Sequence, residues 1–137
     1  MSYDLVVFEA KKAPKKREDF MTWYGQQTEW SEDHEYNNPN VCSPALQNWM
    51  AEMKETFRPM NGPLSPTDEE FDTLSKDTEL HLTDYSMGRD VIYAAFAWSL
   101  AEEAYEKMRS LAIKHETGFF DVSTKNGEIL FPDGIVL

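Results

Sequence analysis

The chain has 137 residues, of which 41% are hydrophobic and 13% aromatic, and its formal net charge is −12. A chain of this length can bury a hydrophobic core without stabilising disulfides or metal ions, and its composition is too apolar for a disordered chain. The acidic excess excludes nucleic acid and anionic membranes as expected partners, since binding to both relies on Lys and Arg. A single cysteine, Cys42, and the lack of a signal-peptide pattern predict one cytoplasmic domain over residues 1–137.

The first predicted elements are a strand and a helix. The segment from Tyr3 to Phe8 (YDLVVF) is apolar on both faces, as in a central strand that other elements cover. A helix is expected after Pro14, because Pro favours the first turn and the apolar residues that follow recur on one helical face. These residues are Phe20, Trp23 and Tyr24.

A second helix is predicted to begin at Pro44, with Ser43 as its N-cap. Apolar residues recur along it at spacings of three and four and mark its buried face: Leu46, Trp49, Met50, Met53 and Phe57. Prolines and a glycine then predict a loop over 59–66. The acidic segment from Ser65 to Leu74 predicts a short helix capped by Ser65, with carboxylates near the positive end of the helix dipole.

Two strands and a long helix are predicted next. The strands, Leu80–Tyr85 and Val91–Trp98, are expected to form a hairpin through Met87-Gly88-Arg89. Ser99 and Glu102 fit a capping box, so a helix is expected to begin at Ser99. Its predicted buried stripe consists of Ala101, Ala104, Tyr105, Met108, Leu111 and Ala112.

The end of the chain predicts a further hairpin. Gly118 suits the turn after the long helix, and Asn126-Gly127 is a strong connection between the strand Phe119–Val122 and the segment EILF. Without one helix and the last strand, the order of elements is β-α-β-β-α-β. The sequence therefore predicts an α+β fold of the ferredoxin-like sandwich type, with a mainly antiparallel sheet and its helices on one face.

Three segments of the chain resemble those of a set of short bacterial proteins for which no activity is established. The segments are SYDLVVFE near the start, FAWSLAEEAYEKMRSLAIKH in the long helix and GFFDVS near the end, and the stretch Trp30–His34 is a fourth point of likeness. The resemblance implies a bacterial source and informs the fold. It carries over no functional residue.

The acidic residues gather in two blocks. Glu18–Asn40 holds six acidic residues and no Lys or Arg, and Pro59–Asp90 holds eight acidic and two basic residues. The densest part, TEWSEDHEYNNPN from Thr28 to Asn40, places aromatics among carboxylates, as in interfaces that anchor by aromatic burial and steer by charge. The predicted partner-binding residues are Glu29, Trp30, Glu32, Asp33, His34, Glu35 and Tyr36. The leading hypothesis is a small acidic module that binds a basic protein, and its concrete form is an immunity protein that neutralises a basic toxin domain.

Two alternatives stay open. Polar residues in or beside the strands predict a cleft for a small-molecule enzyme or sensor, with a homodimer as its expected state: His81, Asp84, Tyr85, Arg89 and Asp121. The acidic stretch also suggests a divalent-cation binder, but it lacks the glycine and spacing of a calcium loop, and His34-Glu35 lacks the second histidine of a zinc motif. No reaction motif or phosphate-binding loop is present, so the sequence predicts no cofactor and no metal ligand and favours binding over catalysis.

Overall fold

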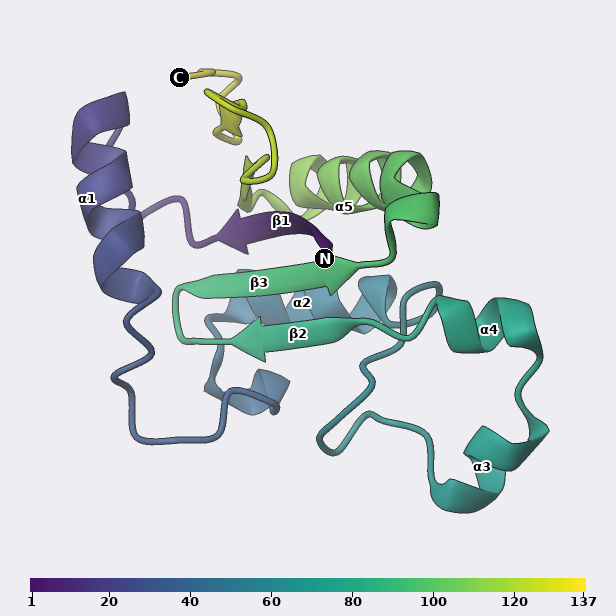
Figure 1. Ribbon diagram of the computed structural model, residues 1–137. Coiled ribbons are helices and arrows are strands. Elements are labelled where there is room, and N and C mark those ends of the chain that lie inside the picture. The colour runs from purple at the N-terminus through teal and green to yellow at the C-terminus, as the bar shows by residue number, and fades with distance from the viewer.

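The computed structural model describes residues 1–137 and forms an α+β fold (Figure 1). In chain order its elements are β1 (Tyr3–Phe8), α1 (Arg17–Gln27), the 3₁₀ helix η1 (Pro39–Val41), α2 (Pro44–Met53), α3 (Asp68–Thr73), α4 (Lys76–Leu80), β2 (Asp84–Met87), β3 (Val91–Phe96), the 3₁₀ helix η2 (Trp98–Leu100), α5 (Ala101–His115), β4 (Gly118–Phe120) and β5 (Ile129–Leu130).

The five strands form one open antiparallel sheet in the order β2-β3-β1-β4-β5. β1 is central, and it pairs along its whole length with β3, from Tyr3 opposite Phe96 to Phe8 opposite Val91. The predicted class, α+β with a mainly antiparallel sheet, is confirmed. The predicted hairpin between the second and third strands is present, because β2 and β3 pair directly across the turn that contains Gly88.

One face of the sheet is covered by α2 and α5. The main core lies there, with Leu5 and Val7 of β1 facing the buried sides of both helices. α2 passes behind β2 and β3 in Figure 1. The predicted stripe of α2 is buried, and that of α5 is buried except for Ala101 and Tyr105, which are partly buried. Trp49 of α2 is fully enclosed, and its indole N–H donates to the carbonyl oxygen of Met108 in α5 at 3.3 Å.

The opposite face of the sheet is covered by α1 and the C-terminal segment. A second apolar cluster lies there, in which Phe20 of α1 packs on Phe8 and Phe120 at ring-centroid distances of 4.9 and 5.4 Å. The expectation that all helices lie on one face is wrong for α1. The reason is the strand itself, because β1 carries large apolar side chains on both faces and both must be removed from water.

Both edges of the sheet are covered by other parts of the chain. At the β2 edge, the N–H of Thr83 donates to the carbonyl of Arg58, and the N–H of Met87 donates to the carbonyl of Tyr36, at 2.9 and 2.8 Å. At the β5 edge, the N–H of Leu137 donates to the carbonyl of Ile129 at 2.9 Å. An exposed sheet edge invites pairing with another chain, and these contacts limit that pairing.

Two predicted helix caps differ from the structure, and a third is in place. Ser43 is the N-cap of α2 as predicted, although its side chain makes no capping hydrogen bond. Ser99 makes no capping hydrogen bond, and α5 begins at Ala101 after the 3₁₀ turn of η2, so the proposed box with Glu102 is absent. The short acidic helix is capped by Thr67 in place of Ser65. Thr67 and Glu70 form a complete capping box, which satisfies two free backbone N–H groups at once.

Two further boundaries also differ. The first half of the predicted strand Leu80–Tyr85 belongs to α4 and its end, because Ser75 caps a helical turn that runs to Leu80. Gly118 is the first residue of β4, and the left-handed residue that ends α5 is Glu116, with φ of 57°. Gly118 is needed there for another reason, since a Cβ atom would lie 2.1 Å from the Phe8 ring. No helix of the protein is long and apolar enough to cross a membrane.

Candidate functional site

The acidic stretch from Thr28 to Asn40 is an ordered loop fastened to the β2–β3 turn. α1 ends at Gln27, so the stretch is not a helical surface. The carboxylate of Glu32 accepts the N–H of Arg89 at 3.1 Å, and the carbonyl of Tyr36 accepts the N–H of Met87. The loop thus caps the turn of a hairpin that is distant in sequence.

Inside this loop, Glu32, His34 and Tyr36 bind one another through side-chain and backbone groups. Nε2–H of His34 donates to Glu32 at 2.6 Å, and Nδ1 of His34 accepts the backbone N–H of Tyr36 at 3.1 Å. The N–H of Glu32 donates to the Tyr36 hydroxyl at 2.5 Å. With Nδ1 as the acceptor of this N–H, Nε2 carries the proton that faces Glu32. These groups satisfy each other and give His34 a structural role.

The predicted partner-binding residues alternate between inward and outward positions. Trp30 and Tyr36 pack edge to face at 5.1 Å, and Trp30 extends the second apolar cluster beside Tyr93. Both have left-handed backbones, with φ of 53° and 60°, which the surrounding contacts hold in place. The outward side chains are Glu29, Asp33 and Glu35, which are exposed. The loop therefore presents acidic charge to solvent, and its aromatic residues lie largely within the fold.

The predicted strand cluster does not form a cleft. Tyr85 is buried and donates to the carbonyl of Phe57 at 2.7 Å, while Asp84 beside it is exposed. Arg89 lies beyond the other end of β2. Asp121 follows β4. Because β1 and β3 lie between β4 and β2, the strands β4 and β2 are roughly 14 Å apart. These side chains, together with His81, are dispersed over three regions of the protein.

Two other residues with reactive side chains, Cys42 and His115, have structural surroundings. Cys42 is buried, and burial raises the pKa of its thiol to about 12, so it is not a thiolate nucleophile near neutral pH. His115 donates to Glu52 across the α2–α5 contact at 2.9 Å. No three His, Cys, Asp or Glu side chains gather closely enough to hold a metal ion.

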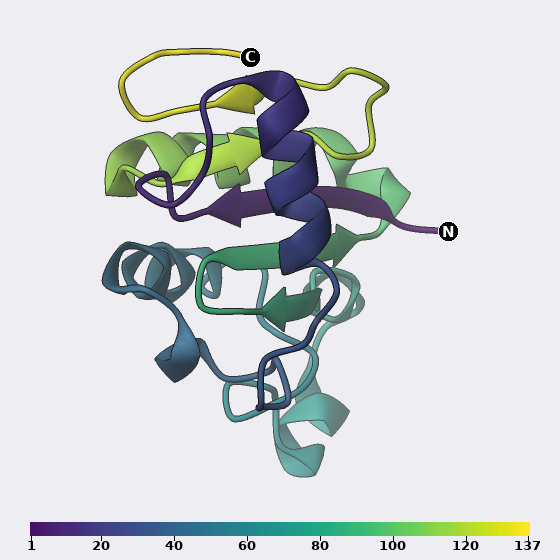
Figure 2. The same ribbon diagram turned by 90° about the vertical axis from the view of Figure 1, so that its left-hand side faces the viewer.

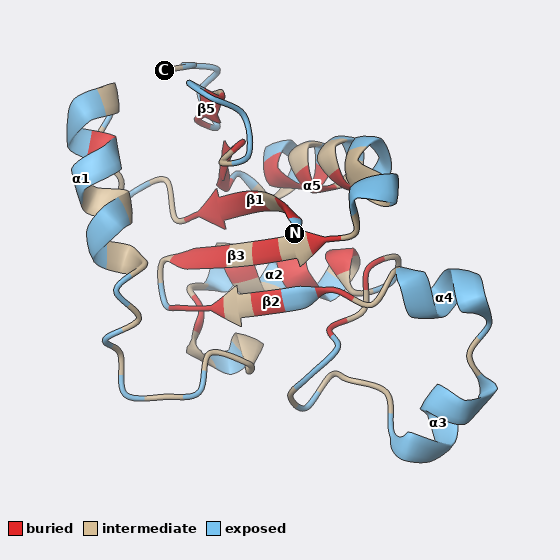
Figure 3. Ribbon diagram, viewed as in Figure 1, coloured by how far each residue is buried: buried red, intermediate tan, exposed pale blue.

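A second acidic surface is more prominent in the structure. Residues 60–82, here called the acidic arm, leave the α2 side of the sheet, form α3 and α4, and return at β2. Figures 1 and 2 both show α3 away from the sheet, and Figure 3 shows α3 and α4 as exposed. The arm holds one Lys and six acidic residues: Asp68, Glu69, Glu70, Asp72, Asp77 and Glu79.

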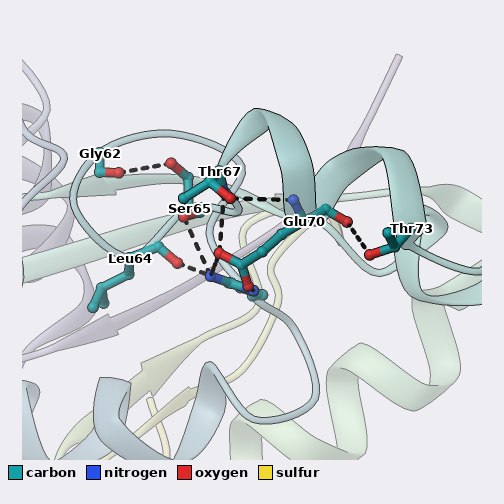
Figure 4. Close-up of polar contacts among 7 residues, drawn as sticks. Gly62, Leu64, Ser65, Thr67, Glu70 and Thr73 are labelled. Atoms are coloured by element: carbon teal, nitrogen blue, oxygen red, sulfur yellow. Dashed lines mark hydrogen bonds and ion pairs between the residues drawn. The ribbon is translucent and has the colours of Figure 1, made fainter.

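Arg58 fastens the first half of the acidic arm. Its guanidinium donates to the carbonyl oxygens of Leu64 and Ser65, at 2.9 and 3.3 Å, and to the carboxylate of Glu70 at 3.0 Å. Figure 4 shows Thr67 beside Glu70, where the Thr67 hydroxyl accepts the Glu70 backbone N–H. Hydrogen bonds with Arg58 are the main cause of a lowered Glu70 pKa. The arm is therefore an ordered projection.

His81 fastens the second half. Its Nδ1 faces the carbonyl oxygen of Asp77 at 2.7 Å, and its Nε2 faces the carboxylate of Glu103 in α5 at 2.6 Å. Both ring nitrogens thus face acceptors, an arrangement that only the imidazolium satisfies in full. Burial by itself lowers the pKa of His81, but the bonds to Asp77 and Glu103 outweigh it and the pKa is raised.

This geometry predicts a pH-dependent contribution to stability. Because the pKa of His81 is higher in the folded chain, the contribution is complete below the unfolded value of about 6.5 and is lost as pH rises through the folded value. Chemical denaturation of wild type and His81→Asn should therefore show a larger stability difference at about pH 5 than at about pH 8. Glu103→Gln should reduce the pH dependence in the same way. A difference that is constant over this range would contradict the assignment.

The acidic arm also exposes apolar side chains among its carboxylates. Phe71 in α3 is 46% exposed and Leu80 at the end of α4 is 45% exposed. Sequence reasoning identified this acidic block but not these two residues. Both could have been predicted from the sequence, because each is a large apolar side chain isolated among charged or polar residues.

Comparisons with protein-family models, with curated proteins and with solved structures find no match to this chain.

Proposed function

We propose that this protein is a small acidic binding module whose acidic arm docks on a basic protein partner. The observation that carries the proposal is the combination found on the arm: six carboxylates, the exposed apolar side chains of Phe71 and Leu80, and an ordered backbone. Charge of one sign speeds the encounter with a partner of opposite sign, and buried apolar residues slow its dissociation. An ordered arm loses less conformational entropy on binding than a flexible one.

The acidic arm suits this role better than the stretch first predicted, Glu29–Tyr36. In that stretch, Trp30 and Tyr36 are already packed against Tyr93 and each other, so they are poor anchors for a partner. Its three exposed carboxylates add to the acidic field of the protein, but the stretch has no exposed large apolar side chain to accompany them. We retain the immunity-protein role as the concrete form of the proposal, since a basic toxin domain is a partner of the required charge.

Charge reversal on the acidic arm provides the test. The triple variant Glu69→Lys, Asp72→Lys and Glu79→Lys should keep the fold, because exposed charges contribute little to stability. Its association with the basic protein that co-purifies with the wild-type chain should slow by roughly tenfold or more at low salt. The salt dependence of the association rate should also decrease. Stopped-flow or surface plasmon resonance kinetics over a salt series measure both quantities.

The chain offers a matched control for this experiment. Glu29→Lys, Asp33→Lys and Glu35→Lys change the net charge by the same amount on the other acidic surface, so they should slow association much less. A third variant, Phe71→Ala, should instead speed dissociation at every salt concentration, by roughly thirtyfold for a hot-spot residue. Equal slowing by the two triple variants would show a general charge effect and would contradict docking through the arm.

We further propose that the fold belongs to the ferredoxin-like type. The β-α-β-β-α-β pattern of that type is supported by β1, α2, β2, β3, α5 and β4 taken in order. The antiparallel order β2-β3-β1-β4 and the placement of α2 and α5 on one face agree with it. In this description α1, the acidic arm and β5 are additions to a common framework.

A further inference from the structure

A small polar cleft lies between the end of α1 and the β2–β3 turn. It has a volume of about 200 Å³, and its lining has no apolar side chain: Gln26, Gln27, Ser31, Glu32, Arg89 and Asp90. It brings together Glu32 and Arg89, which the sequence placed in two different candidate sites. At about 30 Å³ per water molecule, the cleft has room for roughly seven waters, which suits a small polar metabolite.

Arg89 differs from the other arginines of the chain. Arg17, Arg58 and Arg109 each donate to carbonyl or carboxylate oxygens of the protein. Arg89 is exposed and its guanidinium makes no hydrogen bond or ion pair, although half-buried Asp90 lines the same cleft. A guanidinium presents a fork of donors that matches a carboxylate in a bidentate geometry. Arg89 is therefore free to bind such a group.

Asp90 provides an opposite charge that is also free. Its carboxylate accepts no hydrogen bond from the protein, while its main-chain carbonyl is held by the N–H of Glu9 at 2.8 Å. Burial raises the pKa of this carboxyl, and Lys12 and Arg89 oppose that effect in part. The side-chain amides of Gln26 and Gln27 and the hydroxyl of Ser31 likewise have no partner in the protein. In contrast, Glu32 accepts hydrogen bonds from His34 and from the Arg89 backbone.

We propose that this cleft binds a small polar α-amino acid as a zwitterion. The carboxylate of the ligand pairs with the Arg89 guanidinium, its ammonium group pairs with Asp90, and the amides of Gln26 and Gln27 bind its polar side chain. An unpaired cation and an unpaired anion in one concave surface match both charges of such a molecule. The absence of apolar lining excludes a large apolar side chain on the ligand. The proposal is independent of docking through the acidic arm.

NMR titration of the full ¹⁵N-labelled chain tests this assignment. L-serine is the probe, and ethanolamine and 3-hydroxypropionate are its analogues that lack the carboxylate and the ammonium group. L-serine should give saturable shifts confined to the amides of 26–32 and 88–90. Each analogue should bind at least roughly tenfold more weakly, as expected for the loss of one charge-assisted contact.

Variants supply the second arm of the test. Arg89→Gln and Asp90→Asn remove one charge each and should weaken L-serine binding by roughly tenfold or more. Lys125→Gln, an equal charge change in the exposed loop between β4 and β5, should leave binding unchanged. Several results would overturn the proposal: shifts that do not saturate or that lie elsewhere, an unaltered affinity in Arg89→Gln, or ethanolamine binding as tightly as L-serine.

Discussion

Trp49→Ala is expected to lower the free energy of unfolding by about 3–5 kcal/mol, the range for removing a large aromatic side chain from a core. Trp49 is fully buried at the centre of the contact between α2 and α5, and its indole packs edge to face on Tyr85 at 6.4 Å. The substitution leaves a cavity in the main core, and it also removes the donor that reaches the Met108 carbonyl. Urea or guanidinium unfolding, followed by fluorescence or circular dichroism, measures the loss.

The matched control for this prediction is Trp98→Ala. Trp98 lies at the start of η2, is 50% exposed, and contacts Tyr3 with a ring-centroid distance of 5.2 Å. Its removal should reduce stability by about 0.5–1.5 kcal/mol, the range for an aromatic pair. Similar losses for the two variants would show that α2 does not occupy the centre of the core. The position of the acidic arm, which follows α2 in the chain, would then also need revision.

The main core was predictable from sequence because its signal is local and repeated. Apolar residues at spacings of three and four define the buried faces of α2 and α5, and β1 is a short apolar run between charged segments. Each element needs only its own residues to be recognised. The assembly of these elements into an antiparallel sheet followed from their order, since the hairpin and the two crossovers allow few arrangements.

The placement of α1 was not predictable in the same way. Its apolar face of Phe20, Trp23 and Tyr24 was identified, but a helix that follows a strand can pack on either face of a sheet. The choice depends on which other elements cover that face, and here α2 and α5 occupy one side. The double-sided character of β1 was the available signal, because a strand apolar on both faces requires two covering layers.

In the candidate sites, too, contacts between residues distant in sequence could not be predicted. The carboxylates of the stretch Glu29–Tyr36 could be counted, but the partner of Glu32 is the backbone N–H of Arg89, which is 57 positions away. A contact to a distant backbone group leaves no trace in side-chain spacing. By contrast, the capping box of Thr67 and Glu70 has a four-residue signature and could have replaced the assignment of Ser65.

Phe20→Ala should lower the free energy of unfolding by about 3–5 kcal/mol and tests whether the second layer is a true core. Phe20 is fully buried, and its ring contacts Phe8, Phe120 and Tyr24. If α1 were a loosely attached surface helix, this loss would be small. The expected loss is large because four aromatic rings pack together here. Two of them, Phe8 and Phe120, belong to β1 and β4, and the pairing of these strands fixes their positions.

The neighbouring residue provides the control for this prediction. Met21→Ala removes an apolar side chain of comparable length from the same helical turn, but Met21 is 41% exposed and should reduce stability by roughly 1 kcal/mol or less. Because the end of α1 supplies Gln26 and Gln27 to the polar cleft, Phe20→Ala should also increase hydrogen exchange at those residues. Equal, small losses for both variants would contradict a two-sided core. They would also mean that α1 is too weakly held to form one wall of a binding site.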